Sequence, residues 1–256
     1  MDRNDKVALL EESVFENDIK CLWVFAYGSL CWRPGFEFHK AVPGSVTGFQ
    51  RRFWQGNTVH RGTTEKPGRV ATLVEDLSEG EVHGVAFALT GSEALSYLSN
   101  RECAQGGYMS KFIDFQPIEG ERFKVLVYVA TPLNPHWLGD ADLDEIADQI
   151  VTSEGQNGHN VEYLLRLANF MRAHFPDKKD EHLFSLEEKV LWKINVNQMC
   201  LKTMMGSGEG CISFMQKPSS RESSPSQERR NREGGRVETF EHTARVPNTK
   251  LRCLNI

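Results

Sequence analysis

The chain of 256 residues is composed of 39% hydrophobic, 25% charged and 10% aromatic residues. These values are close to the average of soluble globular proteins, which excludes a collagen-like repeat, a coiled-coil rod and a wholly disordered chain. No apolar run approaches the ~20 residues that span a bilayer, and the first twenty residues lack the apolar core of a signal peptide. Because the six cysteines form no Cys-x-x-Cys pair, we expect reduced thiols and a cytoplasmic, cytosolic protein.

The formal net charge of −5 is distributed unevenly. Residues 191–256 carry 11 basic and 6 acidic side chains, which leaves 19 basic and 29 acidic side chains for the preceding part. An acidic body disfavours binding to the phosphate backbone of nucleic acids. The stretch 216–236 contains no hydrophobic residue, so it cannot bury enough apolar surface to fold. We therefore predict an N-terminal extension (1–20), one globular domain (21–192) and a low-complexity, largely disordered basic tail (193–256).

Strand-like patterns dominate the first half of the globular domain. They are short runs rich in β-branched and aromatic residues, bounded by turn residues, or they alternate apolar and polar side chains. One short predicted helix, Ser92–Leu98, interrupts them. The predicted strands are Leu22–Tyr27, Val46–Trp54 with a break at Gly48, Arg69–Glu75, Val82–Leu89, Tyr108–Phe115 and Phe123–Ala130.

Helix-like patterns follow in the second half. Asp142 and Glu145 have the spacing of a capping box, which predicts the start of a helix. Farther on, apolar residues recur at i, i+3, i+4 and i+7, as on one face of an amphipathic helix. Strands followed by segregated helices indicate an α+β fold rather than a doubly wound parallel sheet. The predicted helices are Asp142–Val151, Asn160–His174 and Asp180–Trp192.

The end of the first predicted strand is the most informative local feature. The run Val24–Leu30 reads VFAYGSL, so a strand leads directly into Gly-Ser. Glycine tolerates unusual dihedral angles, and successive backbone N–H groups in such a turn can converge on a carboxylate or an oxyanion. Taken alone, these residues favour a plain strand-to-loop turn, because the run contains no nucleotide-binding glycine motif.

A second candidate is Glu102, which follows the apolar helix face and precedes a Gly-Gly turn. Partial burial of this carboxylate would raise its pKa and make it a usable base near neutral pH. The alternative is a surface glutamate that pairs with Arg101.

The run Arg51–Gly56 (RRFWQG) interleaves basic and aromatic residues, as in proteins that stack on nucleic-acid bases. Within an acidic body we favour structural pairing, or contact with a small anionic ligand. The eight histidines show no metal-binding spacing, so we expect no metal site. Cys31 and Cys103 stand beside the two candidate features, but small buried thiols explain them better than nucleophiles do.

Several of these segments together resemble a known family. They are, in order, WVFAYGSLCWRPGFEF, RRFWQGNTVHRG, KPGRVATLVED, RECAQGGY, ATPLNPHWLG and GHNVEYLLRLANFMRAH. The set resembles the ChaC-type γ-glutamylcyclotransferases, which degrade glutathione, over about residues 22–190. YGSL alone is shared by several related families, whereas the ordered set with RRFWQG and GHNxEYL is far more specific.

The resemblance implies an α+β fold around a small mixed β-barrel with flanking helices. It implies a lyase-type release of 5-oxoproline and cysteinylglycine from glutathione, with no metal and no cofactor. The family's catalytic glutamate falls on Glu102. The family's loop implies a set of substrate-binding residues, and these are Val24, Phe25, Ala26, Tyr27, Gly28, Ser29 and Leu30. We add Tyr108 and Tyr163, either as hydrogen-bond donors to the substrate or as core aromatics.

The chain departs from the family pattern at two places. Ala26 stands where many relatives have Gly, which would be costly only if that residue needed a positive φ. Three residues separate Glu102 from the glycines. One branch of the family has the same spacing, whereas another branch has a single residue at this place. Alternatives remain: a cyclotransferase for other γ-glutamyl compounds, which Arg51, Arg52 or Arg61 could discriminate, or a non-catalytic binding module. The tail either recruits a partner, such as a protein, or has no role.

Overall fold

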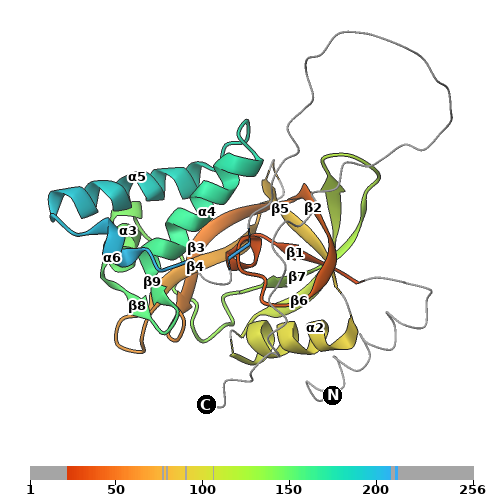
Figure 1. Cartoon of the computed structure of the whole chain (residues 1–256), viewed down its shortest axis with the longest axis horizontal. Helices are drawn as coiled ribbons and strands as arrows, with labels where there is room; N and C mark the ends of the chain where they lie inside the picture. The colour runs from red at the N-terminus through yellow and green to blue at the C-terminus, as the bar shows by residue number, and fades with distance from the viewer. Residues whose placement is uncertain are drawn as a thin grey trace, which may run out of the picture.

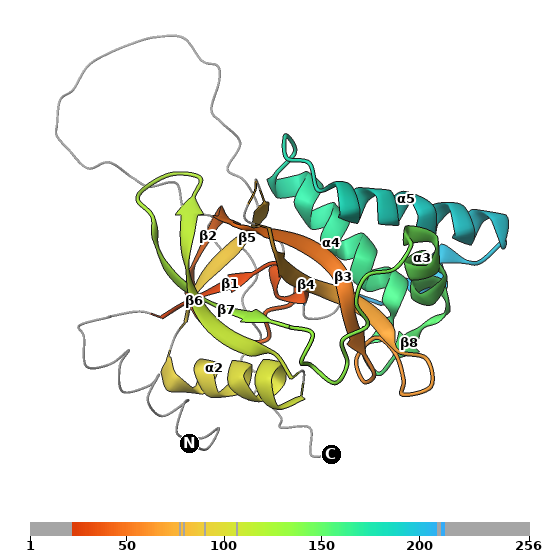
Figure 2. The ribbon, with the colours of Figure 1, turned by 180° about the vertical axis from the view of Figure 1, so that it is seen from behind.

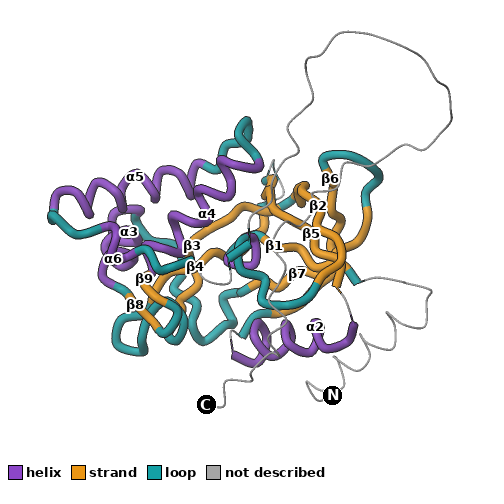
Figure 3. Tube along the Cα trace, viewed as in Figure 1, coloured by secondary structure: helices purple, strands orange, loops and turns teal. Residues whose placement is uncertain are grey.

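The computed structural model describes residues 22–76, 78, 80–89, 91–105, 107–208 and 211–212. The predicted extension 1–20 and most of the predicted tail therefore lie outside the described residues. Two parts lie side by side in Figure 1: a barrel of strands, and a group of helices joined to it by a two-stranded ribbon. The colouring of Figure 3 shows the same segregation of strands and helices, as the sequence predicts for an α+β fold.

Five strands close into the barrel in the order β1-β5-β2-β6-β7. All neighbours are antiparallel except β1 and β7, which pair in parallel. The predicted small mixed barrel is therefore confirmed. Aromatic and β-branched residues fill its interior, and their bulk is what a pleated, closed sheet can bury. The bounds of the strands are Trp23–Ala26 (β1), Phe38–Thr47 (β2), Glu81–Leu89 (β5), Met109–Pro117 (β6) and Phe123–Val129 (β7).

The two-stranded ribbon extends out of the barrel. It consists of β3 (Phe49–Asn57) and β4 (Gly68–Glu75), which pair antiparallel with a bulge between Arg52 and Gln55. Only Gly48, at φ +82°, separates β2 from β3, and this left-handed turn redirects the strand from the barrel into the ribbon. Figure 2 shows the ribbon running from the barrel to the helices.

Helices α3, α4 and α5 pack against the ribbon and against one another. Asp142 caps α3 by accepting a hydrogen bond from Asp144 N at 2.8 Å, as its position in the sequence predicts. A short hairpin connects α3 to α4, and α2 and the π-helical turn η2 lie below the barrel in Figure 1. The bounds are Gly91–Leu98 (α2), Ser99–Gln105 (η2), Leu143–Thr152 (α3), Glu154–Gly155 (β8), Gly158–His159 (β9), Asn160–His174 (α4), Glu181–Val196 (α5) and Leu201–Met204 (α6).

Two boundaries differ from the sequence prediction. β2 begins at Phe38, well before the predicted start at Val46, because Gly44 inside the strand hides the pattern. Gly44 is needed there: a Cβ atom would lie 2.5 Å from the ring of Phe115. α5 runs through the predicted domain end at residue 192 to Val196, and α6 follows, since apolar Ile194 and Met204 are buried.

Among the described residues, none of the helices is both long and apolar enough to cross a membrane.

Candidate active site

The loop that follows β1 is held from inside the protein. Tyr27 Oη donates a hydrogen bond to Tyr128 O at 2.6 Å, which anchors the loop to β7. The carbonyl oxygen of Tyr27 accepts a hydrogen bond from Arg51 Nε at 3.0 Å. Arg51 is only 2% exposed, and it also donates to His83 O and pairs with Asp180, the N-cap of α5. A buried guanidinium thus fixes one peptide plane of the loop.

Three peptide N–H groups of this loop have no partner among the residues that the structure describes. After Gly28 the chain forms the 3-10 turn η1 (Ser29–Cys31), in which Gly28 O accepts from Cys31 N at 3.0 Å and Ser29 O accepts from Arg33 N at 2.9 Å. The C=O and N–H of a trans peptide point in opposite directions. Within the described chain, the N–H groups of Gly28, Ser29 and Leu30 meet no acceptor. They are therefore available to an anionic group.

Gly28 lies against the side chain of Tyr163. A Cβ atom at this position would lie 2.8 Å from Tyr163 Oη. Tyr163 comes from α4, and its hydroxyl accepts a hydrogen bond from Ala71 N at 3.1 Å. The hydroxyl proton of Tyr163 is thus not used by Ala71 and remains available near the loop.

Glu102 lies in the π-helical turn η2, directly beneath this loop in the fold. Its backbone oxygen accepts a hydrogen bond from Tyr108 N at 2.9 Å, and Gly107 adopts φ +66° between them. That left-handed conformation explains the glycine, and it turns the chain from η2 into β6. The Glu102 side chain is 16% exposed. The carboxylate is therefore mostly buried rather than on the surface.

Arg101 connects Glu102 to the loop. Its Nε lies 3.1 Å from Glu102 Oε1, and its Nη2 donates to Ser29 Oγ at 3.0 Å. The sequence left open whether Glu102 is a buried base or the partner of Arg101, and in the structure it is both buried and paired. The link to Ser29 was not predicted, because no sequence signal joins two residues that lie 72 positions apart.

Burial sets the protonation states at this site. It raises the pKa of Glu102, and the neighbouring Arg101 guanidinium only partly opposes this rise. Burial also raises the pKa of Tyr27 and Tyr108 well above the usual value, with a further contribution from the Glu102 charge. The pKa of Tyr163 rises to about 12 for the same reasons. A carboxylate with a raised pKa thus lies among three hydroxyls that stay protonated at neutral pH.

The other predicted site residues occupy the barrel. The side chains of Val24, Phe25, Ala26 and Leu30 are buried in the core, so only their backbone can face a ligand. Ala26 pairs with Val85 as regular antiparallel strand, and its φ is not positive. Alanine is therefore unstrained where many relatives have glycine.

Several of the remaining sequence candidates have structural roles. Arg51 forms the buried network above, and Phe53 is fully buried, so neither is exposed to a nucleic-acid base. Trp54 is half-buried and packs edge-on against Trp137, with ring centroids 6.0 Å apart. Burial raises the pKa of Cys31 to about 12, which leaves its thiol protonated and a poor nucleophile. Cys103 is half-buried. No group of three or more His, Cys, Asp or Glu side chains in the described ranges is placed to hold a metal ion.

Several proteins of known function are similar to this chain in sequence. Glutathione-specific γ-glutamylcyclotransferase 1 of Danio rerio is 49% identical over 175 residues, which cover 66% of this chain and 89% of that protein. The human protein of the same name is 48% identical over 180 residues, with coverage of 68% and 81%. The glutathione-specific γ-glutamylcyclotransferase of Schizosaccharomyces pombe is 35% identical over 189 residues, with coverage of 66% and 92%.

A solved structure gives the same result for the fold. The crystal structure of a yeast γ-glutamyl cyclotransferase specific to glutathione superposes with a TM-score of 0.62 at 28% identity, and covers 67% of this chain and 96% of that one. The family model described as ChaC-like protein matches residues 22–193, which is the barrel, the ribbon and most of the helical layer. This chain belongs to the ChaC-like family.

Proposed function

We propose that this protein is a glutathione-specific γ-glutamylcyclotransferase that releases 5-oxoproline and cysteinylglycine. The observation that carries the proposal is Arg101, whose guanidinium contacts both the Glu102 carboxylate and Ser29 Oγ. This contact fixes the position of Glu102, whose pKa is raised, with respect to the loop after β1. Three N–H groups of that loop have no partner among the described residues. The printed names of the relatives, which specify glutathione, support the substrate.

In this reaction the α-amine of the substrate attacks its own γ-carbonyl carbon. A C–N bond forms to close the five-membered ring, and the peptide C–N bond to cysteine breaks. An α-amino group has a pKa near 8, so at neutral pH most of it is protonated and cannot attack. Glu102 takes a proton from this nitrogen and returns one to the departing nitrogen of cysteine. The raised pKa of Glu102 suits a group that must both accept and release a proton.

The loop amides supply the electrostatic part. The N–H groups of Gly28, Ser29 and Leu30 either hold the α-carboxylate or stabilise the negative charge that develops on the γ-carbonyl oxygen. Both roles require donors whose positions are fixed beforehand, which is what Arg51 provides through the Tyr27 carbonyl. Because the attack is intramolecular, holding the substrate folded removes much of the entropic barrier. Tyr108 and Tyr163 act as neutral hydrogen-bond donors beside Glu102.

We propose the cytosol as the location. The four cysteines in the described part of the chain are free thiols, as expected in a reducing compartment. Residues beyond 212 lie outside the described part, and we keep a protein partner as their proposed role, since their basic charge complements an acidic surface.

The test is release of 5-oxoproline from glutathione and from γ-glutamyl-alanine by wild type and by Glu102→Gln. We expect wild type to prefer glutathione, and Glu102→Gln to lower kcat by about 10²–10⁴-fold, the usual contribution of general acid–base catalysis. Because Glu102→Gln also removes the counter-ion of Arg101, the melting temperature of the variant is measured beside kcat, and loss of turnover counts only for a folded variant.

Glu119→Gln is the matched control, because Glu119 is an exposed glutamate on the turn between β6 and β7 and should leave turnover unchanged. A fully active Glu102→Gln protein would contradict the mechanism. If the folded wild type released 5-oxoproline from neither substrate, a binding module on the same fold would be the better conclusion. Preference for γ-glutamyl-alanine would retain the mechanism and reject glutathione specificity.

A further inference from the structure

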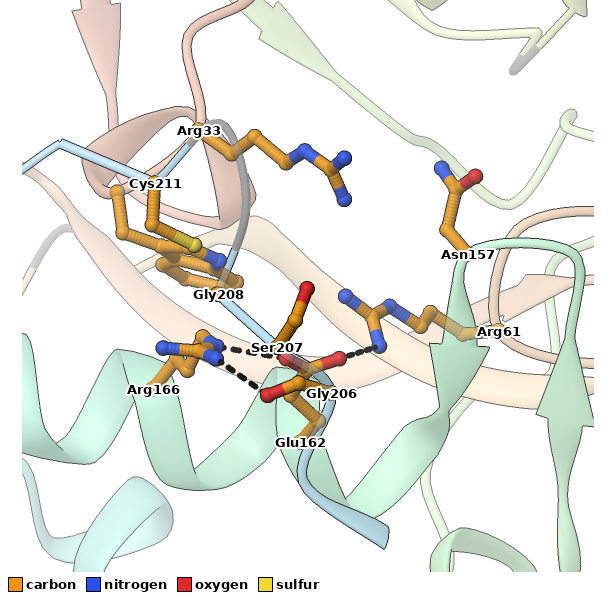
Figure 4. A pocket seen from close by; sticks show the side chains of 10 residues that line it. Arg33, Arg61, Asn157, Glu162, Arg166, Gly206, Ser207, Gly208 and Cys211 are labelled. Atoms are coloured by element: carbon orange, nitrogen blue, oxygen red, sulfur yellow. Dashed lines mark hydrogen bonds and ion pairs between the residues drawn. The ribbon is translucent and has the colours of Figure 1, made fainter.

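A cavity of about 140 Å³ lies beside the candidate active site. Its walls come from the residues that follow η1, from the connection between β3 and β4, from the turn between β8 and β9, from α4 and from the residues that follow α6. Figure 4 shows the side chains around it. Trp32 lines the cavity and packs edge-on against Tyr163, with ring centroids 5.3 Å apart. The cavity therefore flanks the loop at Gly28 without being part of the Glu102 cluster.

The charge around the cavity is positive. Among the described residues that line it, three guanidinium groups, Arg33, Arg61 and Arg166, face one carboxylate, Glu162, which leaves an excess of two positive charges. Both carboxylate oxygens of Glu162 already have a cationic partner, because Arg61 Nη1 lies 2.8 Å from one and Arg166 Nε lies 2.8 Å from the other. Burial alone would raise the pKa of Glu162, but these two partners outweigh it and the pKa falls. The carboxylate is thus ionised and cannot neutralise a third arginine.

Arg61 is the buried member of this group. Its side chain is 7% exposed, and its Nη1 donates to His159 O at 2.9 Å as well as to Glu162. Figure 4 shows its other terminal nitrogen directed into the cavity, with the Arg33 guanidinium and the Ser207 hydroxyl turned toward the same space. Arg33 has no acidic partner among the described residues. Burying a guanidinium with an unused donor is costly unless an anion completes it.

One wall of the cavity lies outside the family match, which ends at residue 193. Two hydrogen bonds hold the described residues of this wall, 205–208 and 211–212: Ile212 N donates to Trp32 O at 2.7 Å, and Arg166 Nη2 donates to Gly206 O at 3.3 Å. Gly206 permits this approach, since a Cβ atom there would lie 3.1 Å from Glu162 Oε1. Ser207 thereby lies opposite Arg33 and Arg61. The cavity is therefore built from residues inside and outside the family match.

We propose that this cavity is a binding site for a carboxylate, held by Arg33 and Arg61 and bordered by residues 205–208 and 211–212. Two guanidinium groups suit the two oxygens of a carboxylate, and Ser207 and Asn157 add neutral polar groups at the rim. The carboxylate has two sources: a small free acid, or the far end of the peptide substrate. The second source rests on the proposed function, whereas the first does not.

The experiment measures binding and turnover separately in the full-length protein. Calorimetry follows the binding of malonate, a small free dicarboxylate, to wild type, Arg33→Gln and Ser207→Asp. Kinetics compare glutathione with its glycine amide, which lacks the far carboxylate. Arg33 and Ser207 are exposed, so both variants should fold. Arg122→Gln and Asn195→Asp, also exposed and distant from the cavity lining, are the matched controls and should change neither quantity.

The two sources give different results. For a free acid, both variants weaken malonate binding about tenfold or more, and the KM for glutathione stays unchanged. For the substrate carboxylate, both variants raise the KM for glutathione about tenfold without changing kcat, the KM for the amide stays unchanged, and malonate competes with glutathione. A tenfold effect is the scale of one charge-assisted hydrogen bond.

The proposal is overturned if wild type binds no malonate and both variants keep the KM of wild type for glutathione. It is also overturned if the control variants reproduce the effects, since these would then come from general charge. Because malonate binding needs no turnover, a failed cyclotransferase assay leaves the binding arm intact, and the two failures can be told apart.

Discussion

The barrel and the ribbon–helix layer, meaning β3, β4 and helices α3 to α5, are built in different ways. On the barrel strands, Ser45 and His83 are the only buried polar residues among those described. The ribbon–helix layer instead buries a larger set of charged and polar side chains, most of which form hydrogen bonds or ion pairs. This set is Arg51, Gln55, Arg69, Thr72, Asn160, Glu162 and Glu187.

The difference explains how the site is positioned. Apolar packing keeps the barrel compact but accepts small shifts, whereas buried hydrogen bonds are satisfied only at particular distances and angles. Glu102 and Tyr108 come from the barrel side, Tyr163 and Arg51 come from the ribbon–helix layer, and the loop Tyr27–Leu30 lies between them. The barrel side thus supplies Glu102, the proposed base, and the ribbon–helix layer holds the loop in place through Arg51.

The largest expected effect is on the stability of the barrel core. Phe115 is fully buried between Phe25 and Phe123. Phe115→Ala should lower the free energy of unfolding by about 3–5 kcal/mol, because it removes a large ring and leaves a cavity. Phe112→Ala on the same strand is the control: its ring is 40% exposed, so we expect a loss below about 1 kcal/mol. Urea denaturation measures both, and equal losses would contradict a packed barrel.

A substitution in the ribbon–helix layer should lower the free energy of unfolding by less, and through a lost hydrogen bond rather than lost packing. Asn160 Oδ1 accepts from Arg69 N at 2.6 Å, and its Nδ2 donates to Arg69 O at 2.9 Å. Asn160→Ala leaves both buried backbone groups unpaired, so we expect a loss of about 2–3 kcal/mol. Asn195→Ala on the exposed face of α5 should stay within about 0.5 kcal/mol. A neutral Asn160→Ala would show that the layer does not depend on its hydrogen bonds.

Tyr163→Phe sharpens the comparison at the boundary between the two parts. The substitution keeps the ring, which packs against Phe53 and Trp32, and removes only the hydroxyl. Ala71 N then loses its acceptor, so the free energy of unfolding should fall by about 1–2 kcal/mol. If the hydroxyl also serves the substrate, kcat/KM falls severalfold in the same protein. Loss of stability with unchanged kcat/KM would show that the Tyr163 hydroxyl serves the structure through Ala71 N and does not contact the substrate.

The smallest expected effect is a shift in pH dependence. Arg101 lowers the pKa of Glu102 against the larger effect of burial. Without that cation the carboxylate holds its proton more strongly, so Arg101→Met should move the acid limb of kcat/KM to higher pH. Arg101→Lys retains the charge and should move it less. A pH profile of the three proteins decides the question, and a shift toward lower pH would contradict the assignment of Glu102 as the base.

Strong periodic patterns made most of the fold predictable. The helix predicted over Asn160–His174 has those bounds in the structure, because its apolar residues repeat at helical spacing without interruption. The start of β2 was missed, since Pro43 and Gly44 read as turn residues although Gly44 makes room for Phe115. The pattern of residues along a segment indicates its conformation. It does not indicate which side chain from elsewhere in the fold, such as Phe115, needs the space that a glycine leaves.

The site was predictable only in part. The loop and Glu102 could be placed from their motifs, whereas the contact between Arg101 and Ser29 depends on how η2 packs beneath β1. The segment 205–212 was assigned to the tail because it is rich in glycine and serine. Its order comes from hydrogen bonds to Trp32 and Arg166, which no property of the segment itself indicates.

The single-residue connection at Gly48 has a mechanical consequence. β2 and β3 belong to separate sheets, and this one residue links them. Its N–H donates to Gly80 O at 2.7 Å and its carbonyl oxygen accepts from Asp76 N at 2.9 Å, so the connection is held by the neighbouring chain and is not a free hinge. Rotating one part against the other would break these hydrogen bonds. Substrate admission and product release must then proceed through local movement of loops and side chains, inside a frame that keeps its shape throughout the catalytic cycle.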